Sequence, residues 1–199
     1  MKKVALIISL TAAMQLASAA TVVYGNSTPF AGDSRHGPNY LLGSEITIDQ
    51  QITLQDVGII FRSAGYFANF GLYSDMHGSP DRLLDSTGVF IVIATGDTHQ
   101  AFQDNSIITP GTYWLMGVFD GPASVGKNFE TSILVAYKSF SDIFALPATF
   151  GAALTYSGTQ LNYYITGATV DSVPEPETYV MLLAGLGALG VVARRRKSL

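Results

Sequence analysis

The sequence predicts an all-β protein, with one β-sandwich domain of jelly-roll-like form between two terminal segments of a different kind. Short stretches in which apolar and polar residues alternate dominate residues 21–172. Clusters of Gly, Pro, Asp and Ser separate these stretches, and no segment before Thr178 keeps a helical periodicity over ten residues. Short strands divided by turns at regular spacing are typical of sandwiches and barrels.

The first strands are expected after an irregular lead-in loop. Residues 21–44, rich in Gly and Pro, predict this loop with one edge strand at most. Residues 45–54 put Ile46, Ile48, Ile52 and Leu54 on one face of a strand, and residues 58–61 continue as a more buried one. Further strands, rich in β-branched and aromatic residues, are predicted at residues 67–73, 88–94, 112–119, 132–137, 150–156 and 161–169. Turns are predicted at residues 75–81, 95–97, 109–111, 120–122 and 157–159, with room for one helical turn at residues 79–84.

The N-terminal segment, residues 1–20, has the pattern of a secretory signal peptide. Lys2 and Lys3 form a positive start, and residues 4–14 form an apolar stretch. Ala17 and Ala19 provide a small-x-small cleavage site, so we expect the general secretion machinery to export the chain and cleavage after Ala19 or Ala20.

The C-terminal segment predicts a membrane helix. Residues 178–193 carry no charge, and a basic tail at residues 194–197 follows at once. The apolar run is a little shorter than the roughly 20 residues of a typical span, which flanking arginines can compensate. Since basic residues stay on the cytoplasmic side, residues 21–172 are expected outside the cytoplasm.

The exported part is acidic. Residues 21–172 contain five Lys and Arg against thirteen Asp and Glu, a net charge of about minus eight. This charge repels phosphates and argues against nucleic acid as a partner. The chain has no cysteine, which excludes disulfides, thiolate nucleophiles and cysteine-based metal sites.

The tail resembles a family of sorting signals. Val173, Pro174, Glu175 and Pro176, the apolar segment, and then Arg194, Arg195 and Arg196 are similar to PEP-CTERM signals in type, order and spacing. The resemblance implies a Gram-negative host that makes biofilm or exopolysaccharide. It also implies transient anchoring in the inner membrane, recognition of residues 173–176 by an exosortase, and transfer to the cell surface or extracellular matrix. A Pro-rich linker before an anchor is the alternative.

A second, looser resemblance covers residues 45–140. Leu72 to Asp75, a Gly-Pro loop at residues 78–80, and residues 111–115 (GTYWL) are similar to the β-sandwich ectodomains of bacterial surface proteins called choice-of-anchor domains. The resemblance implies a fold and a surface location, and no activity.

Few residues mark a catalytic or metal site. His36, His77 and His99 lie in predicted loops without the spacing of zinc ligands. Asp75, Asp81 and Asp85 lie near one loop and are candidate calcium ligands, although aspartates also favour turns for their own hydrogen bonds. Neither Glu45 nor Glu130 suggests a glycosidase pair, and no G-x-S-x-G motif occurs. We therefore expect no enzymatic activity and no cofactor, apart from the calcium for which these aspartates are candidate ligands.

Aromatic residues offer a further hypothesis. Tyr113, Trp114, Phe119, Tyr163 and Tyr164 could stack on sugars, but in strands about half of such residues pack in the core. Trp114 is expected in the core, whereas one of Tyr163 and Tyr164 is expected at the surface. The sequence thus predicts an exported protein with a structural or adhesive role. A carbohydrate-binding module for exopolysaccharide, with or without calcium, is the alternative.

Overall fold

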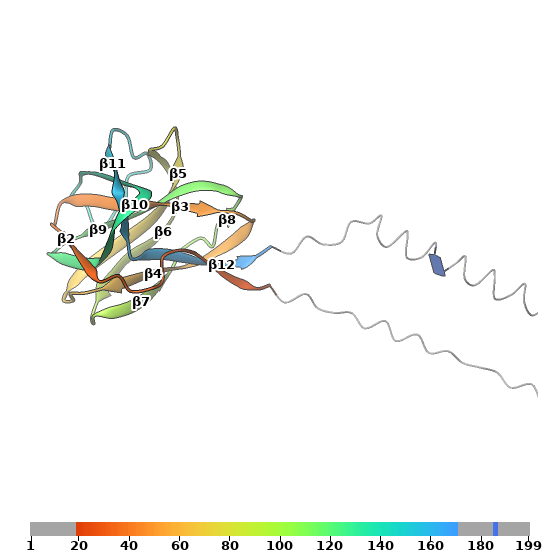
Figure 1. Cartoon of the computed structure of the whole chain (residues 1–199), viewed down its shortest axis with the longest axis horizontal. Helices are drawn as coiled ribbons and strands as arrows, with labels where there is room; N and C mark the ends of the chain where they lie inside the picture. Colours follow the sequence, from red (N-terminus) through yellow and green to blue (C-terminus); the bar gives the residue numbers. More distant parts are fainter. Residues whose placement is uncertain (1–18, 171–184, 187–199) are drawn as a thin grey trace, which may run out of the picture. The chain divides into compact units, whose positions relative to one another are not determined.

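Antiparallel β-strands make up the part of the protein that the structure describes. The structure is a computed structural model and describes residues 19–170 and 185–186. Within residues 19–170 there are twelve strands and no helix, which confirms the predicted all-β class. The strands are β1 (Thr21–Gly25), β2 (Gly32–His36), β3 (Tyr40–Ile48), β4 (Ile52–Phe61), β5 (Tyr66–Asp75), β6 (Pro80–Val92), β7 (Gly96–Ala101), β8 (Ile107–Ile108), β9 (Gly111–Phe119), β10 (Ala123–Ser139), β11 (Leu154–Leu161) and β12 (Tyr163–Thr169) (Figure 1).

One layer of the sandwich is built around β4. β12 pairs with one edge of β4, and β7 and β8 pair with its other edge. β1 completes the layer by pairing with the outer edge of β12. All of these pairings are antiparallel.

The second layer follows the order β6-β5-β9-β3-β10-β11. The long strand β10 pairs with β2 through its first half and with β3 through its second half. One pairing, between Val125 of β10 and Phe61 of β4, links the layers into a single hydrogen-bonded sheet. The predicted sandwich is therefore one continuous sheet that covers both sides of its core.

The main core lies between the two layers. Buried side chains from β4 and β12, such as Ile59 and Tyr163, belong to the same apolar cluster as Phe70 of β5 and Leu115 of β9. The rings of Phe70 and Tyr163 meet edge to face across the layers, with centroids 5.1 Å apart. This is a favourable geometry for aromatic pairs, and it adds to the stabilisation from burying the rings.

A second core covers the opposite face of the second layer. Trp114, Met116 and Val118 alternate along β9 with residues of the main core, and they pack with Tyr73 and Phe150. The segment between β10 and β11, residues 140–153, supplies Phe150 and other apolar residues that cover this face. β9 is thus buried on both sides, which explains why its sequence is almost continuously apolar.

Several predicted boundaries were wrong. The expected lead-in loop at residues 21–44 contains β1, β2 and the start of β3. Residues 45–54 are not one strand, because a turn at residues 49–51 takes the chain from β3 in one layer to β4 in the other. The residues with room for a helical turn belong mostly to β6, and the predicted turns at residues 95–97 and 157–159 are partly or wholly in β7 and β11.

The first and last residues of the described domain are neighbours. The backbone N–H of Thr169 donates to the carbonyl of Ala20 at 2.9 Å, and the N–H of Ala20 donates to Oγ1 of Thr169 at 3.0 Å. Figure 1 shows β1 and β12 side by side at one end of the domain and β2 towards the other end. Of the described residues, no helix is both long and apolar enough to span a membrane.

Candidate ligand-binding site

Three tyrosines line up across β3, β10 and β11. Tyr40 pairs with Ser139, and Tyr156 pairs with Val135. Both partners lie two residues from Tyr137 along β10. Because side chains alternate with a period of two in a strand, the three tyrosines lie on the same face of the second layer.

The three rings contact one another edge to face. The centroid of Tyr137 lies 6.4 Å from that of Tyr40 and 6.0 Å from that of Tyr156, with interplanar angles of 62° and 69°. Tyr40 is 47% exposed and Tyr156 is 44% exposed. The tilted rings therefore turn their faces in different directions and form walls, not one flat platform.

These rings wall a hollow that we call the tyrosine pocket. Its volume is about 420 Å³, within the range of sites that hold small organic ligands. It is lined by Ser34, Arg35, His36, Gly37, Tyr40, Leu42, Lys127, Tyr137 and Tyr156. No acidic residue is among them.

His36 is the buried polar residue of this pocket. It is 4% exposed and packs edge to face on Phe119, with centroids 5.4 Å apart. Burial, reinforced by the charge of Lys127 and opposed by Asp33, lowers the pKa of His36 to about 3, so the imidazole is neutral. Neither ring nitrogen has a hydrogen-bond partner within the described residues. Both nitrogens are shielded from solvent, and a buried polar group of this kind is costly when left unsatisfied.

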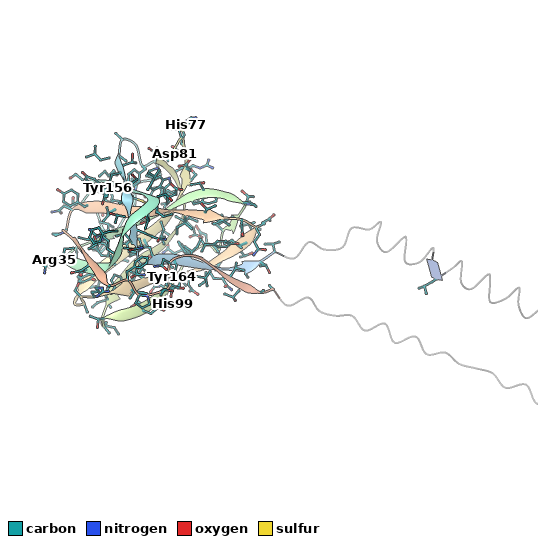
Figure 2. The ribbon with its side chains drawn as sticks, viewed as in Figure 1. Arg35, His77, Asp81, His99, Tyr156 and Tyr164 are labelled. Atoms are coloured by element: carbon teal, nitrogen blue, oxygen red, sulfur yellow. The ribbon has the colours of Figure 1, made fainter. Side chains whose placement is uncertain are left out.

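Two cations border the tyrosine pocket. Lys127 lines it from β10, with its ammonium 4.3 Å from the ring centroid of Phe129. Arg35 lines it from β2, and its side chain is 90% exposed. Figure 2 shows Arg35 and Tyr156 on the same side of the domain, away from the ends of β1 and β12.

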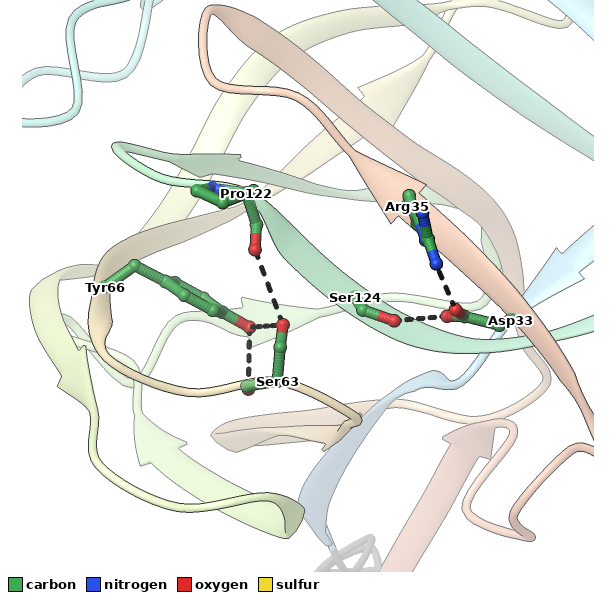
Figure 3. Close-up of polar contacts among 6 residues, drawn as sticks. All are labelled: Asp33, Arg35, Ser63, Tyr66, Pro122 and Ser124. Carbon is green, nitrogen blue, oxygen red and sulfur yellow. Dashed lines mark hydrogen bonds and ion pairs between the residues drawn. The ribbon is translucent and has the colours of Figure 1, made fainter.

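Arg35 also belongs to an adjacent hollow. Arg62 lines that second hollow and donates to the carbonyl of Phe30. Figure 3 shows its single acidic group, Asp33, which accepts a hydrogen bond from Ser124 and lies 3.9 Å from Nε of Arg35. A long contact of this kind on an exposed arginine leaves the guanidinium available.

The same figure shows how the β4–β5 turn is held beside this hollow. The hydroxyl of Tyr66 donates to the carbonyl of Ser63 at 3.0 Å, and Oγ of Ser63 donates to the carbonyl of Pro122 at 3.5 Å. These bonds tie the turn to the loop that begins β10 and so fix one rim of the hollow.

A third hollow continues from the tyrosine pocket along β10. The two share Tyr40 and Tyr137, and the third one is otherwise lined by residues 138, 139 and 152–154. Lys138 is already engaged there, because its ammonium donates to the carbonyl of Phe150 and lies 4.6 Å from that ring's centroid. Together the two hollows make an elongated surface with room for a chain-like ligand.

A hollow elsewhere in the domain lacks these features. It lies near β8 and contains Arg82 and Tyr113. Tyr113 is buried, and its hydroxyl donates to the carbonyl of Thr109 at 2.8 Å. No side chain that lines this hollow is among the buried polar groups left without a partner, which makes the tyrosine pocket the better candidate.

The predicted calcium ligands do not converge. Asp75 accepts hydrogen bonds from Nε1 of Trp114 and from the N–H of Gly78. Asp85 is buried and accepts from backbone N–H groups, whereas Asp81 lies at the start of β6. Among residues 19–170, no three His, Asp or Glu side chains are grouped to hold a metal ion. The register of β5 and β6 leaves Asp75 opposite Pro80, the neighbour of Asp81, but places Asp85 opposite Leu72, three residues further along β5.

The histidines differ from the prediction as well. His77 does lie in a turn, with a φ of 56°, but His36 and His99 lie in strands. His36 is buried. His99 is 2.9 Å from the hydroxyl of Tyr164, which also donates to Asp97 at 2.6 Å.

The predicted sugar-stacking aromatics are all in the interior. Tyr113, Trp114, Phe119, Tyr163 and Tyr164 are buried. Trp114 was expected there, whereas the expectation that Tyr163 or Tyr164 faces solvent was wrong. Tyr164 is covered because Gly58 on the paired strand has no side chain, so the ring occupies that space. The predicted site residues did not include Tyr40, Tyr137 or Tyr156, although Tyr137 and Tyr156 fall in predicted strands.

The predicted sorting and signal residues lie outside the described part of the chain. This applies to the sorting residues Val173, Pro174, Glu175, Pro176, Arg194, Arg195 and Arg196, to Ala17 of the cleavage site, and to the predicted membrane helix apart from residues 185–186. Ala19 and Ala20 are the first described residues and are exposed.

Comparison with protein families identifies the C-terminal segment. Residues 172–197 match the family described as PEP-CTERM protein-sorting motif. The chain therefore carries this motif, as its sequence pattern predicts, and the motif implies export, processing by an exosortase and sorting to the cell surface. No curated protein matches the chain.

Proposed function

We propose that this chain with a PEP-CTERM sorting motif is a non-catalytic adhesive protein of the cell surface or extracellular matrix, whose β-domain binds polysaccharide through the tyrosine pocket. The observation that carries this proposal is the arrangement of three tyrosine rings around one hollow. Tyr137 contacts Tyr40 and Tyr156 edge to face, and the outer two tyrosines are 47% and 44% exposed. Partly exposed aromatic rings that wall a hollow can pack against the rings of a sugar.

Sugars suit both kinds of surface in the pocket. The faces of a pyranose ring are rich in C–H groups, which pack on aromatic rings such as those of Tyr137 and Tyr156. Its hydroxyls both donate and accept, as the hydroxyl groups of tyrosine do. The hollow that shares Tyr40 and Tyr137 gives a neighbouring sugar a place to lie, so the ligand is a chain and not a single ring.

The residues of the pocket favour binding over catalysis. Glycoside hydrolysis normally needs two carboxylates on either side of the scissile bond, and the nine residues that line the pocket include no Asp or Glu. We therefore propose that the domain holds the polysaccharide without cleaving it. Binding then attaches the protein to the extracellular matrix, after the sorting step has delivered the protein to the cell surface.

Affinity electrophoresis of the purified full chain through gels that contain polysaccharides tests this function. We expect retardation of the wild-type protein that persists in EDTA and is lost in Tyr156→Ala. Phe144→Ala is the matched control, because Phe144 is an exposed aromatic residue outside the pocket. Absence of retardation by every polysaccharide, with the protein still retained in the matrix, would instead favour a scaffold. Retardation lost in EDTA would favour a calcium-dependent lectin.

A further inference from the structure

We propose that the polysaccharide is anionic, and that Lys127 and Arg35 pair with its negatively charged groups. This inference rests on the proposed function, since it names the class of ligand for the same tyrosine pocket. The inference gives a role to the cations of the domain, because the binding of a neutral glycan would not require them.

The first argument is the distribution of charge. Residues 21–172 carry five Lys and Arg against thirteen Asp and Glu. Three of these five cations, Arg35, Arg62 and Lys127, line the tyrosine pocket and the hollow that adjoins it. The same two hollows contain one acidic residue, Asp33. An acidic domain repels a polyanion over most of its surface, so a polyanion is attracted only where the cations of the domain cluster.

The second argument is that these cations are available. Across the described residues, Lys127 has no carboxylate within 4 Å, and Arg35 has only the long contact with Asp33. Lys127 is half-buried with its ammonium over the ring of Phe129, whereas the ammonium of Lys138 donates to the carbonyl of Phe150. A cation without a carboxylate partner gains the most from a new anionic one.

The third argument is position. Lys127 and Arg35 line the same hollow as Tyr137 and Tyr156. A sugar ring held by the tyrosines can therefore place a ring substituent beside the cations without leaving the pocket. His36 contributes no charge, because its imidazole is neutral. Carboxylate and sulfate substituents share the required chemistry.

Titration calorimetry of the full chain with defined oligosaccharides tests the inference. The ligands are a hexameric uronate, a sulfated glucan and a neutral glucan of equal length, with single-stranded DNA as a polyanion without sugar-ring stacking. The variants are Lys127→Gln, Arg35→Gln and, as the matched control, Arg82→Gln, which removes a cation that lines a different hollow.

We expect the wild-type protein to bind the uronate or the sulfated glucan more tightly than the neutral glucan. Affinity for the anionic ligand should fall about two- to fivefold in each pocket variant, as for a partly exposed ion pair, and stay unchanged in Arg82→Gln. Preference between uronate and sulfate identifies which anionic group is bound. Added salt should weaken the binding of wild type more than that of Lys127→Gln.

Two results would overturn the inference while the proposed function stands. The first is equal binding of neutral and anionic glucans. The second is binding of the anionic ligand that is unchanged in Lys127→Gln and Arg35→Gln but lost in Tyr156→Ala. DNA bound as tightly as the uronate would also overturn it, because charge alone would then suffice. If no glycan binds at all, both the inference and the proposed function fail.

Discussion

The indole Nε1 of Trp114 donates a hydrogen bond of 2.8 Å to Oδ1 of Asp75. Oδ2 of the same carboxylate accepts from the N–H of Gly78 at 3.2 Å. Asp75 thus fastens the centre of β9 to the end of β5 and shapes the turn that follows. Residues 72–75 and residues 111–115 lie side by side here.

Asp75→Ala should destabilise the domain by about 1–3 kcal/mol, because it leaves a buried indole N–H without its acceptor. Asp75→Asn, which keeps an acceptor oxygen, should cost less. Trp114 is the only tryptophan, so urea unfolding followed by its fluorescence measures the effect directly. Asp81→Asn is the control, and a free energy of unfolding for Asp75→Ala equal to that of wild type would contradict the assignment.

Asp85 should be more important still for stability. It is 2% exposed, and its carboxylate accepts from the backbone N–H groups of Ser86, Asp104 and Ser106 at 2.8, 3.2 and 3.1 Å. Asp85→Ala leaves these donors unpaired and should cost about 3 kcal/mol or more. Chemical denaturation of Asp85→Ala beside Asp104→Asn, which changes an exposed carboxylate, checks this. Similar midpoints for the two variants would refute it.

Ionised Glu45 should destabilise the domain at neutral pH, and this destabilisation should disappear in acid. Glu45 pairs with Trp114 across β3 and β9, and burial, followed by the charge of Asp75, raises the pKa of Glu45 above 4.5. A raised pKa in the folded state means that ionised Glu45 opposes folding, and that this cost disappears as the pH falls through that pKa. Glu45→Gln should therefore raise Tm at pH 7, with a gain that shrinks towards pH 4. A lower Tm at pH 7 would show that the carboxylate is stabilising.

Gly58→Ala should disrupt the packing of Tyr164, because a methyl group at this position would overlap the tyrosine ring. Overpacking of this kind costs about 1–3 kcal/mol. In a Tyr164→Ala background the added methyl finds space, so the cost of Gly58→Ala should be smaller there. Thermal unfolding of the two single variants and the double variant measures the coupling; strictly additive changes in free energy would rule out the contact.

Replacement of Pro174, Glu175 and Pro176 by alanine should block exosortase processing in the native host. Prolines disfavour a helix, and an extended peptide is what the cleft of a processing enzyme binds. We expect the longer, unprocessed form to accumulate in the membrane fraction on immunoblots, whereas Val170→Ala, outside the matched segment, is processed normally. Normal removal of the tail from the triple variant would argue against recognition of this motif.

The strands that could be predicted from sequence are those that bury most of their side chains. β9 and β12 are examples, since both are buried at consecutive positions and the core requires apolar residues along them. β2 could not be predicted, because Gly32–His36 (GDSRH) has no apolar alternation and is a strand only through its pairing with β10. Its β-structure is a consequence of tertiary pairing, which overrides local preference.

The candidate site was less predictable than the fold. Tyr40, Tyr137 and Tyr156 meet because of the register of three strands, and Tyr40 is 97 residues from Tyr137 in the chain. Sequence patterns give the face of a residue within one strand, but not which strands are neighbours. The aspartates gave the opposite error, because Asp75, Asp81 and Asp85 are close in sequence but are not grouped as metal ligands in the described part of the chain.

The place of β12 between β1 and β4 also determines how the domain bears force. A domain held by a polysaccharide at the tyrosine pocket and tethered through Val170 would be pulled along the length of β12. The backbone hydrogen bonds on both edges of β12 run across this direction. These hydrogen bonds would be loaded together in shear and would not break one after another from one end of the strand. If the proposed function holds, the pairing that brings Ala20 and Thr169 together would therefore suit the domain to sustain tension between a cell and its surroundings.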